Sequence, residues 1–339
     1  MAVNRVLYAT QVCKIALLQT TGGSSNAQSG GYNILLPIQT ASADETIPQD
    51  DVLVMGKIGG VARVQKDVAT TKASVKAFMA SAGKYNDGSN TAWPGSYHGD
   101  TKQMAEMLSD LEVAATEGVQ CQITCNSSGS AGGSDDGFNI HGIINNIGID
   151  ASKGAFPMLD LSFEGVGRMN SLVMGTGSTL AGSHGGVTSI ESVTPLVSTD
   201  VTMGTNPDAN DTINSVKFSF DLPTETLSRL GGLILGSRAT VASDNAIFSK
   251  PPYKASMTVD GQSLDSVNTQ WNSASSDNSL SNSIGVQFRK GSTANTGFMV
   301  AVNNSGAAVS SRSFSQNVGD VGATFSVSAE GTDATFTQK

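Results

Sequence analysis

The chain has few charged and aromatic residues and no long apolar run. Charged side chains make up 14% of its 339 residues and aromatic side chains 6%. Long exposed helices require Lys, Glu and Arg, so this composition disfavours a helical protein, whereas Ser, Thr, Asn and 38 glycines favour short strands joined by turns. No segment approaches the length of a membrane span, and residues 1–11 contain no apolar core of a signal peptide. We therefore expect a soluble, mainly β protein without a membrane partner, made in a reducing compartment.

The residues that carry most enzyme chemistry are also scarce. Three cysteines, Cys13, Cys121 and Cys125, cannot build a disulfide framework, and no histidine adjoins them to suggest a metal site. The three histidines lie in separate contexts, and none has a second histidine four residues away. The Gly-rich segments lack the Lys-Ser/Thr of a phosphate-binding loop. We expect no enzyme, no catalytic residue, no metal and no cofactor.

The charge balance argues against binding to nucleic acid. The net charge is −9, and the sequence contains no cluster of Lys and Arg that could neutralise phosphates. A mildly acidic surface repels polyanions, although the same charge is also compatible with a role in solubility alone. Sequence-specific DNA or RNA binding is therefore not expected.

One strand pattern occurs near the end of each half of the chain. Lys153–Gly165 (KGAFPMLDLSFEG) and Gly319–Gly331 (GDVGATFSVSAEG) share a Ser-x-Glu-Gly ending, and their apolar residues alternate in the same phase. A period of two is typical of a strand with one buried face. The repetition suggests one unit encoded twice.

Three further pairs of segments recur in the same order: Lys72–Val75 with Lys254–Met257, Val52–Gly60 with Leu227–Gly236, and Tyr32–Ile38 with Val216–Leu222. Chance accounts poorly for four collinear pairs. We predict a first β domain over residues 1–169, a Gly/Ser-rich linker over 170–200 and a second β domain over 201–339.

Two other segments are distinctive. Thr101–Ala115 is the one convincing helix, because Thr101 can cap its start and an apolar stripe follows at helical spacing (Met104, Met107, Leu108 and Leu111). Gln39–Asp51 is polar and too long for a hairpin turn, so we expect a long functional loop there, followed by a strand within Val52–Val64.

Three features resemble the tail-tube (major tail) proteins of long-tailed bacteriophages: the opening MAVNRVLYATQ, the long loop after the second predicted strand, and the VGDVGATFSVSAEG ending. The resemblance implies two tandem β-sandwich or partly open barrel domains, each with a short flanking helix. In that family, the inner sheets of six domains join into a ring, and the rings stack into the tube that conducts DNA. A duplicated chain then implies trimeric rings with pseudo-sixfold symmetry. If only one half were tube-like, a plain hexamer carrying a decoration domain would be expected instead.

The same resemblance implies the partners and the contact region. The partners are other copies of the chain, tape-measure and terminator proteins and, in a contractile tail, a sheath, while DNA passes without specific binding. The protein would belong to the virion tail and assemble in the host cytoplasm. Ring-to-ring contacts would involve the predicted loop, with Asp44, Glu45, Asp50 and Asp51 as candidates. The alternatives are another virion or surface β protein, such as a decoration, fibre or adhesin module, and a carbohydrate-active module.

Overall fold

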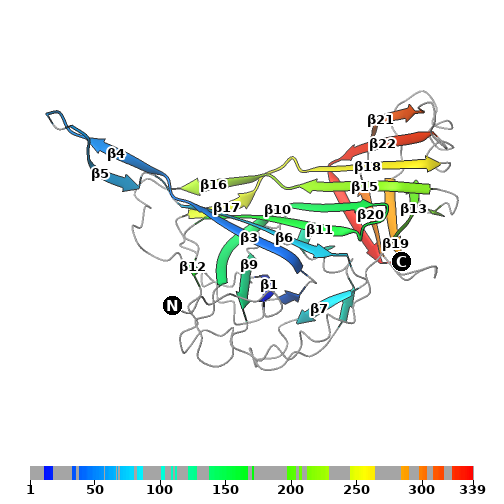
Figure 1. Ribbon diagram of the computed structural model, residues 1–339, viewed down its shortest axis with the longest axis horizontal. Coiled ribbons are helices and arrows are strands. Elements are labelled where there is room, and N and C mark those ends of the chain that lie inside the picture. Colours follow the sequence, from blue (N-terminus) through cyan, green and yellow to red (C-terminus); the bar gives the residue numbers. More distant parts are fainter. Residues whose placement is uncertain are drawn as a thin grey trace.

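The chain is built almost entirely of antiparallel strands (Figure 1). The computed structural model describes residues 11–17, 33–35, 38–56, 58–65, 67, 69–79, 82–86, 101–103, 108–109, 111–112, 121–127, 137–166, 170–171, 197–203, 206–207, 212–228, 245–263, 284–289, 298–303, 308–316 and 323–338. Among these residues no sheet closes into a barrel. The expectation of a mainly β protein is confirmed.

The strands fall into two halves along the chain. The first half contains β1 (Gln11–Leu17), β2 (Asn33–Leu35), β3 (Ile38–Thr46), β4 (Gln49–Leu53), β5 (Gly60–Gln65), β6 (Thr70–Phe78), β7 (Ala82–Asn86), β8 (Thr101–Gln103), β9 (Cys121–Ser127), β10 (Gly137–Ser152), β11 (Met158–Val166) and β12 (Asn170–Ser171). The second half contains β13 (Val197–Met203), β14 (Asn206–Pro207), β15 (Thr212–Asp221), β16 (Thr224–Ser228), β17 (Asn245–Ser249), β18 (Lys254–Ser263), β19 (Ile284–Arg289), β20 (Phe298–Asn303), β21 (Ala308–Ser315), β22 (Thr324–Gly331) and β23 (Asp333–Gln338).

One sheet runs through both halves and is called the long sheet below. Its strand order is β3-β6-β11-β10-β15-β18-β22-β21, and every neighbouring pair is antiparallel. The first half supplies the strands from β3 to β10, and the second half supplies those from β15 to β21. The pairing of β10 with β15 joins the halves, so hydrogen bonding is continuous across the molecule.

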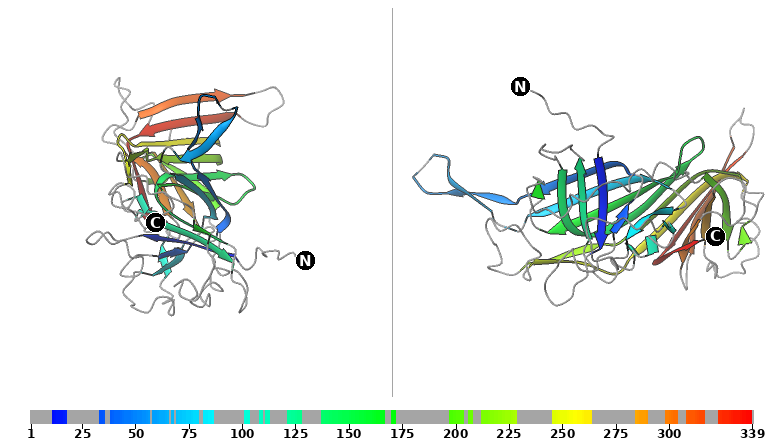
Figure 2. Two further views of the ribbon diagram at one scale, coloured as in Figure 1. Left: turned by 90° about the vertical axis from the view of Figure 1, so that its left-hand side faces the viewer. Right: turned by 90° about the horizontal axis from the view of Figure 1, so that it is seen from below.

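A second layer covers one face of the long sheet (Figure 2). In the first half, this layer has the order β10-β9-β1-β2-β7-β8. In the second half, it has the order β14-β13-β19-β20-β23. The strand β10 belongs to both layers of the first half, because its first residues pair with β9 and its later residues pair with β11.

The pairings of the first half recur in the second half. The corresponding pairs are β1–β2 with β13–β14, β1–β9 with β13–β19, β9–β10 with β19–β20, β10–β12 with β20–β23, β3–β6 with β15–β18, β6–β11 with β18–β22, β10–β11 with β21–β22, and β4–β5 with β16–β17. Thus β10 of the first half corresponds to both β20 and β21 of the second. These eight pairings follow the same order along the chain in both halves, whereas β2–β7 and β7–β8 of the first half have no counterpart among the described strands of the second.

Two local details repeat as well. The register of β10 against β11 shifts between Ile144 and Asn146, and the register of β21 against β22 shifts between Val309 and Ser311. An ion pair joins the Lys at the start of the Lys-Ala-Ser segment to the Glu of the Ser-x-Glu-Gly segment in both halves. The N···O distance is 3.6 Å for Lys72–Glu164 and 3.1 Å for Lys254–Glu330. The Lys-Ala-Ser and Ser-x-Glu-Gly matches therefore fall on strands at equivalent positions.

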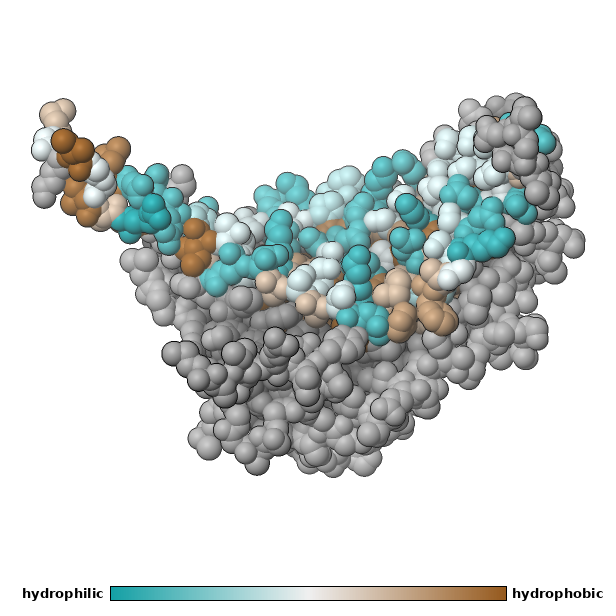
Figure 3. All heavy atoms as spheres, viewed as in Figure 1, coloured by the Kyte–Doolittle hydropathy of each residue, from teal (hydrophilic) through white to brown (hydrophobic). Residues whose placement is uncertain are grey.

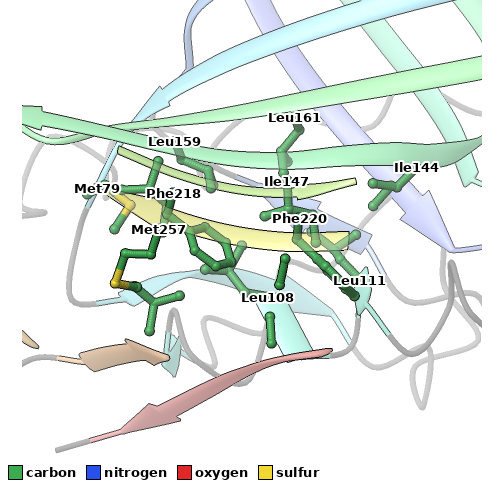
Figure 4. Close-up of a cluster of buried hydrophobic side chains, with 14 of the residues drawn as sticks. Met79, Leu108, Leu111, Ile144, Ile147, Leu159, Leu161, Phe218, Phe220 and Met257 are labelled. Atoms are coloured by element: carbon green, nitrogen blue, oxygen red, sulfur yellow. The ribbon is translucent and has the colours of Figure 1, made fainter. Parts of the chain in front are cut away.

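The core lies between the two layers, and both halves contribute to it (Figure 4). The buried side chains of the long sheet alternate along its inner strands, as in Leu159 and Leu161 of β11 and Phe218 and Phe220 of β15, none more than 3% exposed. Alternation arises because successive side chains of a strand point to opposite faces. Packing across the β10–β15 junction makes the two halves mutually dependent.

The helix prediction was partly wrong. Thr101 lies in strand β8 and cannot cap a helix, whereas Leu108 and Leu111 are helical and fully buried, as the apolar stripe predicted. The other stripe residues, Met104 and Met107, lie outside the described residues. The capping signal misled because a Thr before an apolar stretch is equally compatible with a short strand.

Three other predictions were wrong in whole or in part. Gln39–Asp51 is not a loop: it forms most of β3 and the start of β4, with only Ile47 and Pro48 between these strands. The region Val52–Val64 is not one strand, because the chain reverses at Met55–Gly56 and forms the β4–β5 hairpin. The match of Tyr32–Ile38 with Val216–Leu222 was also wrong, since the pairings make β3 the counterpart of β15.

The predicted linker over 170–200 contains β12 at its start and the first residues of β13 at its end. Its central part, including the Gly/Ser-rich segment, lies outside the described residues, as do Leu230–Leu235 and most of the polar segment after β18.

Candidate functional site

The face of the long sheet that is turned away from the second layer is polar, and it is called the polar face below. On β6, β11, β10, β15, β18 and β22, the residues between the buried ones are half-buried or exposed, and nearly all are polar. In Figure 3 this surface is hollowed between the projecting hairpin at one end and β21 and β22 at the other, and teal and white residues prevail across it. A wide, concave, polar sheet surface with few apolar side chains is suited to contact with water.

Carboxylates outnumber lysines among the described residues of the polar face. Its lysines are Lys72, Lys76, Lys217 and Lys254, and its acids are Asp44, Asp150, Asp160, Glu164, Asp221, Asp260 and Glu330. Several of these charges are paired, as in Lys76–Asp160 at 3.1 Å. Because its lysines are few and mostly neutralised by neighbouring acids, this face offers little attraction to phosphate groups.

Side chains also link strands across the junction between the halves. The side-chain amide of Asn146 on β10 donates hydrogen bonds to the Ser219 hydroxyl at 2.7 Å and to the Asp221 carboxylate, both on β15. The Thr224 hydroxyl at the start of β16 donates to Glu164 of β11 at 2.5 Å. The junction between the halves is therefore stabilised by side-chain hydrogen bonds as well as by backbone hydrogen bonds.

The long sheet ends on both sides in strands with one open edge. Among the described strands, β3 pairs only with β6, and β21 pairs only with β22. An open edge presents free backbone donors and acceptors and favours pairing with another strand. Phe314 on β21 is 59% exposed at this edge, although it lies on the core-facing side of the sheet and its ring contacts Phe325.

The β4–β5 hairpin projects beyond the other strands (Figure 1) and carries exposed apolar side chains at its tip. Met55 and Ile58 are fully exposed, and Leu53 is 74% exposed. The turn contains Gly56 and Gly59 with φ of +88° and +98°, a conformation that favours glycine. Exposed apolar residues gathered on a projecting element mark a contact surface.

The four acidic residues predicted for ring contacts lie in two separate places. Asp44 and Glu45 lie on the edge strand β3, whereas Asp50 and Asp51 lie on β4, in the stem of the hairpin. Asp51 forms an ion pair with Arg63 across the hairpin at 2.9 Å. The apolar tip was missed because the consecutive apolar residues Val52–Met55 resemble a buried strand.

One carboxyl in the described part of the chain has a strongly shifted pKa. Glu112 follows the buried Leu111 in the helix, and burial together with the negative charge of Asp333 raises its pKa to about 7. Asp333 begins β23, so the helix of the first half lies close to the second half at this point.

Within the described residues, no group of three or more His, Cys, Asp or Glu could hold a metal ion. The same residues include no helix long and apolar enough to cross a membrane. No family model matches this chain. No curated protein matches it either. The open edges, the polar face and the projecting hairpin are therefore interpreted from their geometry.

Proposed function

We propose that this chain is a tail-tube subunit of a long-tailed bacteriophage. Its two halves act as tandem tail-tube domains, and copies assemble side by side into rings, three chains to a ring with pseudo-sixfold symmetry. The rings stack into a tube through which DNA is ejected. The role is structural, without a catalytic step or a cofactor.

The observation that carries the proposal is the long sheet with its two open edges. The same set of pairings occurs twice within it, and one junction between equivalent units is already made inside the chain. A unit that joins its own copy edge to edge can continue in the same way to further copies, and closure into a ring removes all open edges. A sheet that ended at β3 and β21 would leave both edges exposed to uncontrolled pairing.

The polar face suits the wall of a DNA channel. Its hydroxyl, amide and carboxylate groups hold water, and its lysines are balanced by acids such as Asp160 and Glu164. A conduit must not retain the polyanion that passes through it, so weak attraction to phosphate is an advantage here. In this arrangement the buried face and the second layer form the outer part of the ring.

The apolar tip of the β4–β5 hairpin suits contact between stacked rings. Burying a side chain such as Leu53 or Met55 against a neighbouring ring contributes about 1.5–3 kcal/mol. Asp50 and Asp51 would lie at the stem of that contact. The terminator, the tape measure and, in a contractile tail, a sheath are the other expected partners in the virion.

Negative-stain electron microscopy of the purified chain tests the proposal. We expect tubes or rings with a central hole, and particle averaging should resolve threefold or pseudo-sixfold symmetry. Globular monomers at every protein concentration and salt condition would contradict the function. Binding or hydrolysis of a glycan would favour a carbohydrate-active module instead.

A further inference from the structure

We infer that neighbouring copies join by pairing β21 of one chain with β3 of the next, in the register that β10 and β15 adopt inside the chain. The inference rests on the proposed function, which supplies the neighbouring copy. It adds the strands, the register and the residues that meet. The occupant of each open edge is thus a second copy of this chain.

The repeated pairings establish which strands correspond. The strand β10 pairs with β11 as β21 pairs with β22, and β15 pairs with β18 as β3 pairs with β6. Each half of the chain, called a unit here, therefore ends on one side of the long sheet in a strand equivalent to β10 and on the other side in a strand equivalent to β15. Within the chain, the β10-like edge of the first unit pairs with the β15-like edge of the second. The two edges left open, β21 and β3, are the same two kinds of edge.

The strand registers also establish which residues correspond along each strand. The shared shift in register aligns Asn146 of β10 with Ser311 of β21, and the ladder then continues residue by residue. On the other side, the matched Lys-Ala-Ser segments of β6 and β18 align Ser219 of β15 with Ser42 of β3. In the internal junction, Gly148 lies opposite Ser219 and Ile149 lies opposite Phe218.

Transferring this register to the open edges places Ser313 opposite Ser42 and Phe314 opposite Ala41. The faces agree, because Ser313 and Ser42 fall on the polar face, whereas Phe314 and Ala41 fall on the core-facing side. A large side chain then meets a small one, in keeping with close packing. The polar pair Ser311 and Asp44 takes the place of Asn146 and Asp221.

The exposed fractions of equivalent side chains differ between the internal junction and the open β21 edge. Ile149 in the internal junction is 2% exposed, whereas its counterpart Phe314 is 59% exposed. The side chain of Glu164, which receives a hydrogen bond from Thr224 of the next unit, is 24% exposed, and its counterpart Glu330 is 51% exposed. The second unit thus lacks, on its β21 side, the cover that the first unit receives from β15 and β16.

Disulfide cross-linking tests the register. In an antiparallel pair, directly opposite residues have Cα atoms about 4.5–5.5 Å apart, which a disulfide can bridge, whereas residues shifted by two positions are about 7–8 Å apart. The test variant carries Ser313→Cys with Ser42→Cys, and the shifted control carries Ser313→Cys with Thr40→Cys. A positive control, Asp150→Cys with Lys217→Cys, places the pair in the internal junction. The single variants measure the background from the native cysteines.

After oxidation we expect covalent ladders between chains for the test variant, at least tenfold more abundant than for the shifted control. The ladder should end at the number of chains in one ring. The positive control should form its bond within one chain and leave the mass on a non-reducing gel unchanged. Tubes or rings that cross-link through the shifted pair, or through neither pair, would overturn the register and leave the proposed function standing. A chain that stays monomeric in microscopy and on the gel would overturn both.

Discussion

Gly142 lies where β10 passes from the second layer into the long sheet, and no side chain fits there. A Cβ atom at this position would lie 2.5 Å from the backbone oxygen of Glu164. Because that neighbour is backbone within a paired strand, the strand must shift to admit a methyl group. We expect Gly142→Ala to destabilise the fold by about 1–3 kcal/mol. The measurement is the midpoint of thermal unfolding.

Gly60→Ala is the matched control for this change. A Cβ at Gly60 would meet its nearest atom, in Asp51, at 3.6 Å, an ordinary contact. We expect an unchanged midpoint for this variant. Equal midpoints for the two variants would show that the crossing of β10 between the layers tolerates a side chain.

Glu112 gives the fold a pH dependence of predictable sign. Its pKa is raised from 4.5 to about 7 in the folded chain, so between these values the folded state binds more protons than the unfolded state. The contribution of this group to stability is therefore greatest below pH 4.5. It decreases as the pH rises, and the full cost of ionisation is present above pH 7.

Glu112→Gln removes that cost. We expect the variant to unfold at a higher temperature than the parent chain at pH 8, and the difference should shrink at pH 5. The measurement is thermal unfolding of both chains at the two pH values. A variant that is less stable at pH 8 would mean that the ionised carboxylate is favourable, contrary to the effect of burial and of Asp333.

At the scale of elements, we expect the edge strand β21 to control side-by-side assembly. Phe314→Ser should leave the isolated chain folded, because this side chain is already 59% exposed, but should abolish rings in microscopy. Phe156→Ser is the matched control, since Phe156 is 56% exposed, makes a similar edge-to-face contact with Phe78, and lies in the turn between β10 and β11. Loss of rings in both variants, or in neither, would argue against a specific role of the β21 edge.

We expect the β4–β5 hairpin to control the stacking of rings. Deleting the predicted loop Gln39–Asp51 would remove the edge strand β3, so the sharper variant replaces Leu53, Met55 and Ile58 by Ser. We expect folded rings that do not lengthen into tubes. Gln49→Ser in the stem of the same hairpin is the control and should form normal tubes. Tubes of normal length from the triple variant would exclude the apolar tip from ring-to-ring contact.

The buried strands could be predicted from sequence, whereas the edge elements could not. Alternation in Leu159–Phe163 and Val216–Phe220 predicted strands with one buried face, because the core selects apolar residues at every second position. The strand β3 lacks that signal: both its faces are largely exposed in the single chain, so its sequence is mostly polar and resembles a loop. The four acidic candidates were predicted as one loop for the same reason. What a neighbouring copy would bury is not visible in the alternation of one chain.

At the scale of the whole molecule, the repeated connectivity gives the polar face one continuous surface built from both halves. Three 34.8 kDa chains joined at equivalent edges would present this surface around a common axis. The charge on that surface would then determine how DNA passes, because each lysine that contacts a phosphate releases counterions and strengthens binding. In the proposed ring, the excess of carboxylates over lysines on the polar face would therefore be a functional property.

Reversing one charge on the polar face should convert the conduit into a DNA-binding surface. Asp150 is exposed on β10, and Asp150→Lys repeats the new positive charge in every chain along the tube. We expect assembled tubes of this variant to co-sediment a short DNA duplex that the parent tubes leave in solution, with retention that decreases steeply as salt rises. Asp333→Lys makes the same charge change on β23, in the second layer, and should behave like the parent. Equal retention by the two variants would mean that DNA meets the outside of the tube rather than the polar face, and the assignment of that face to the channel would have to be abandoned.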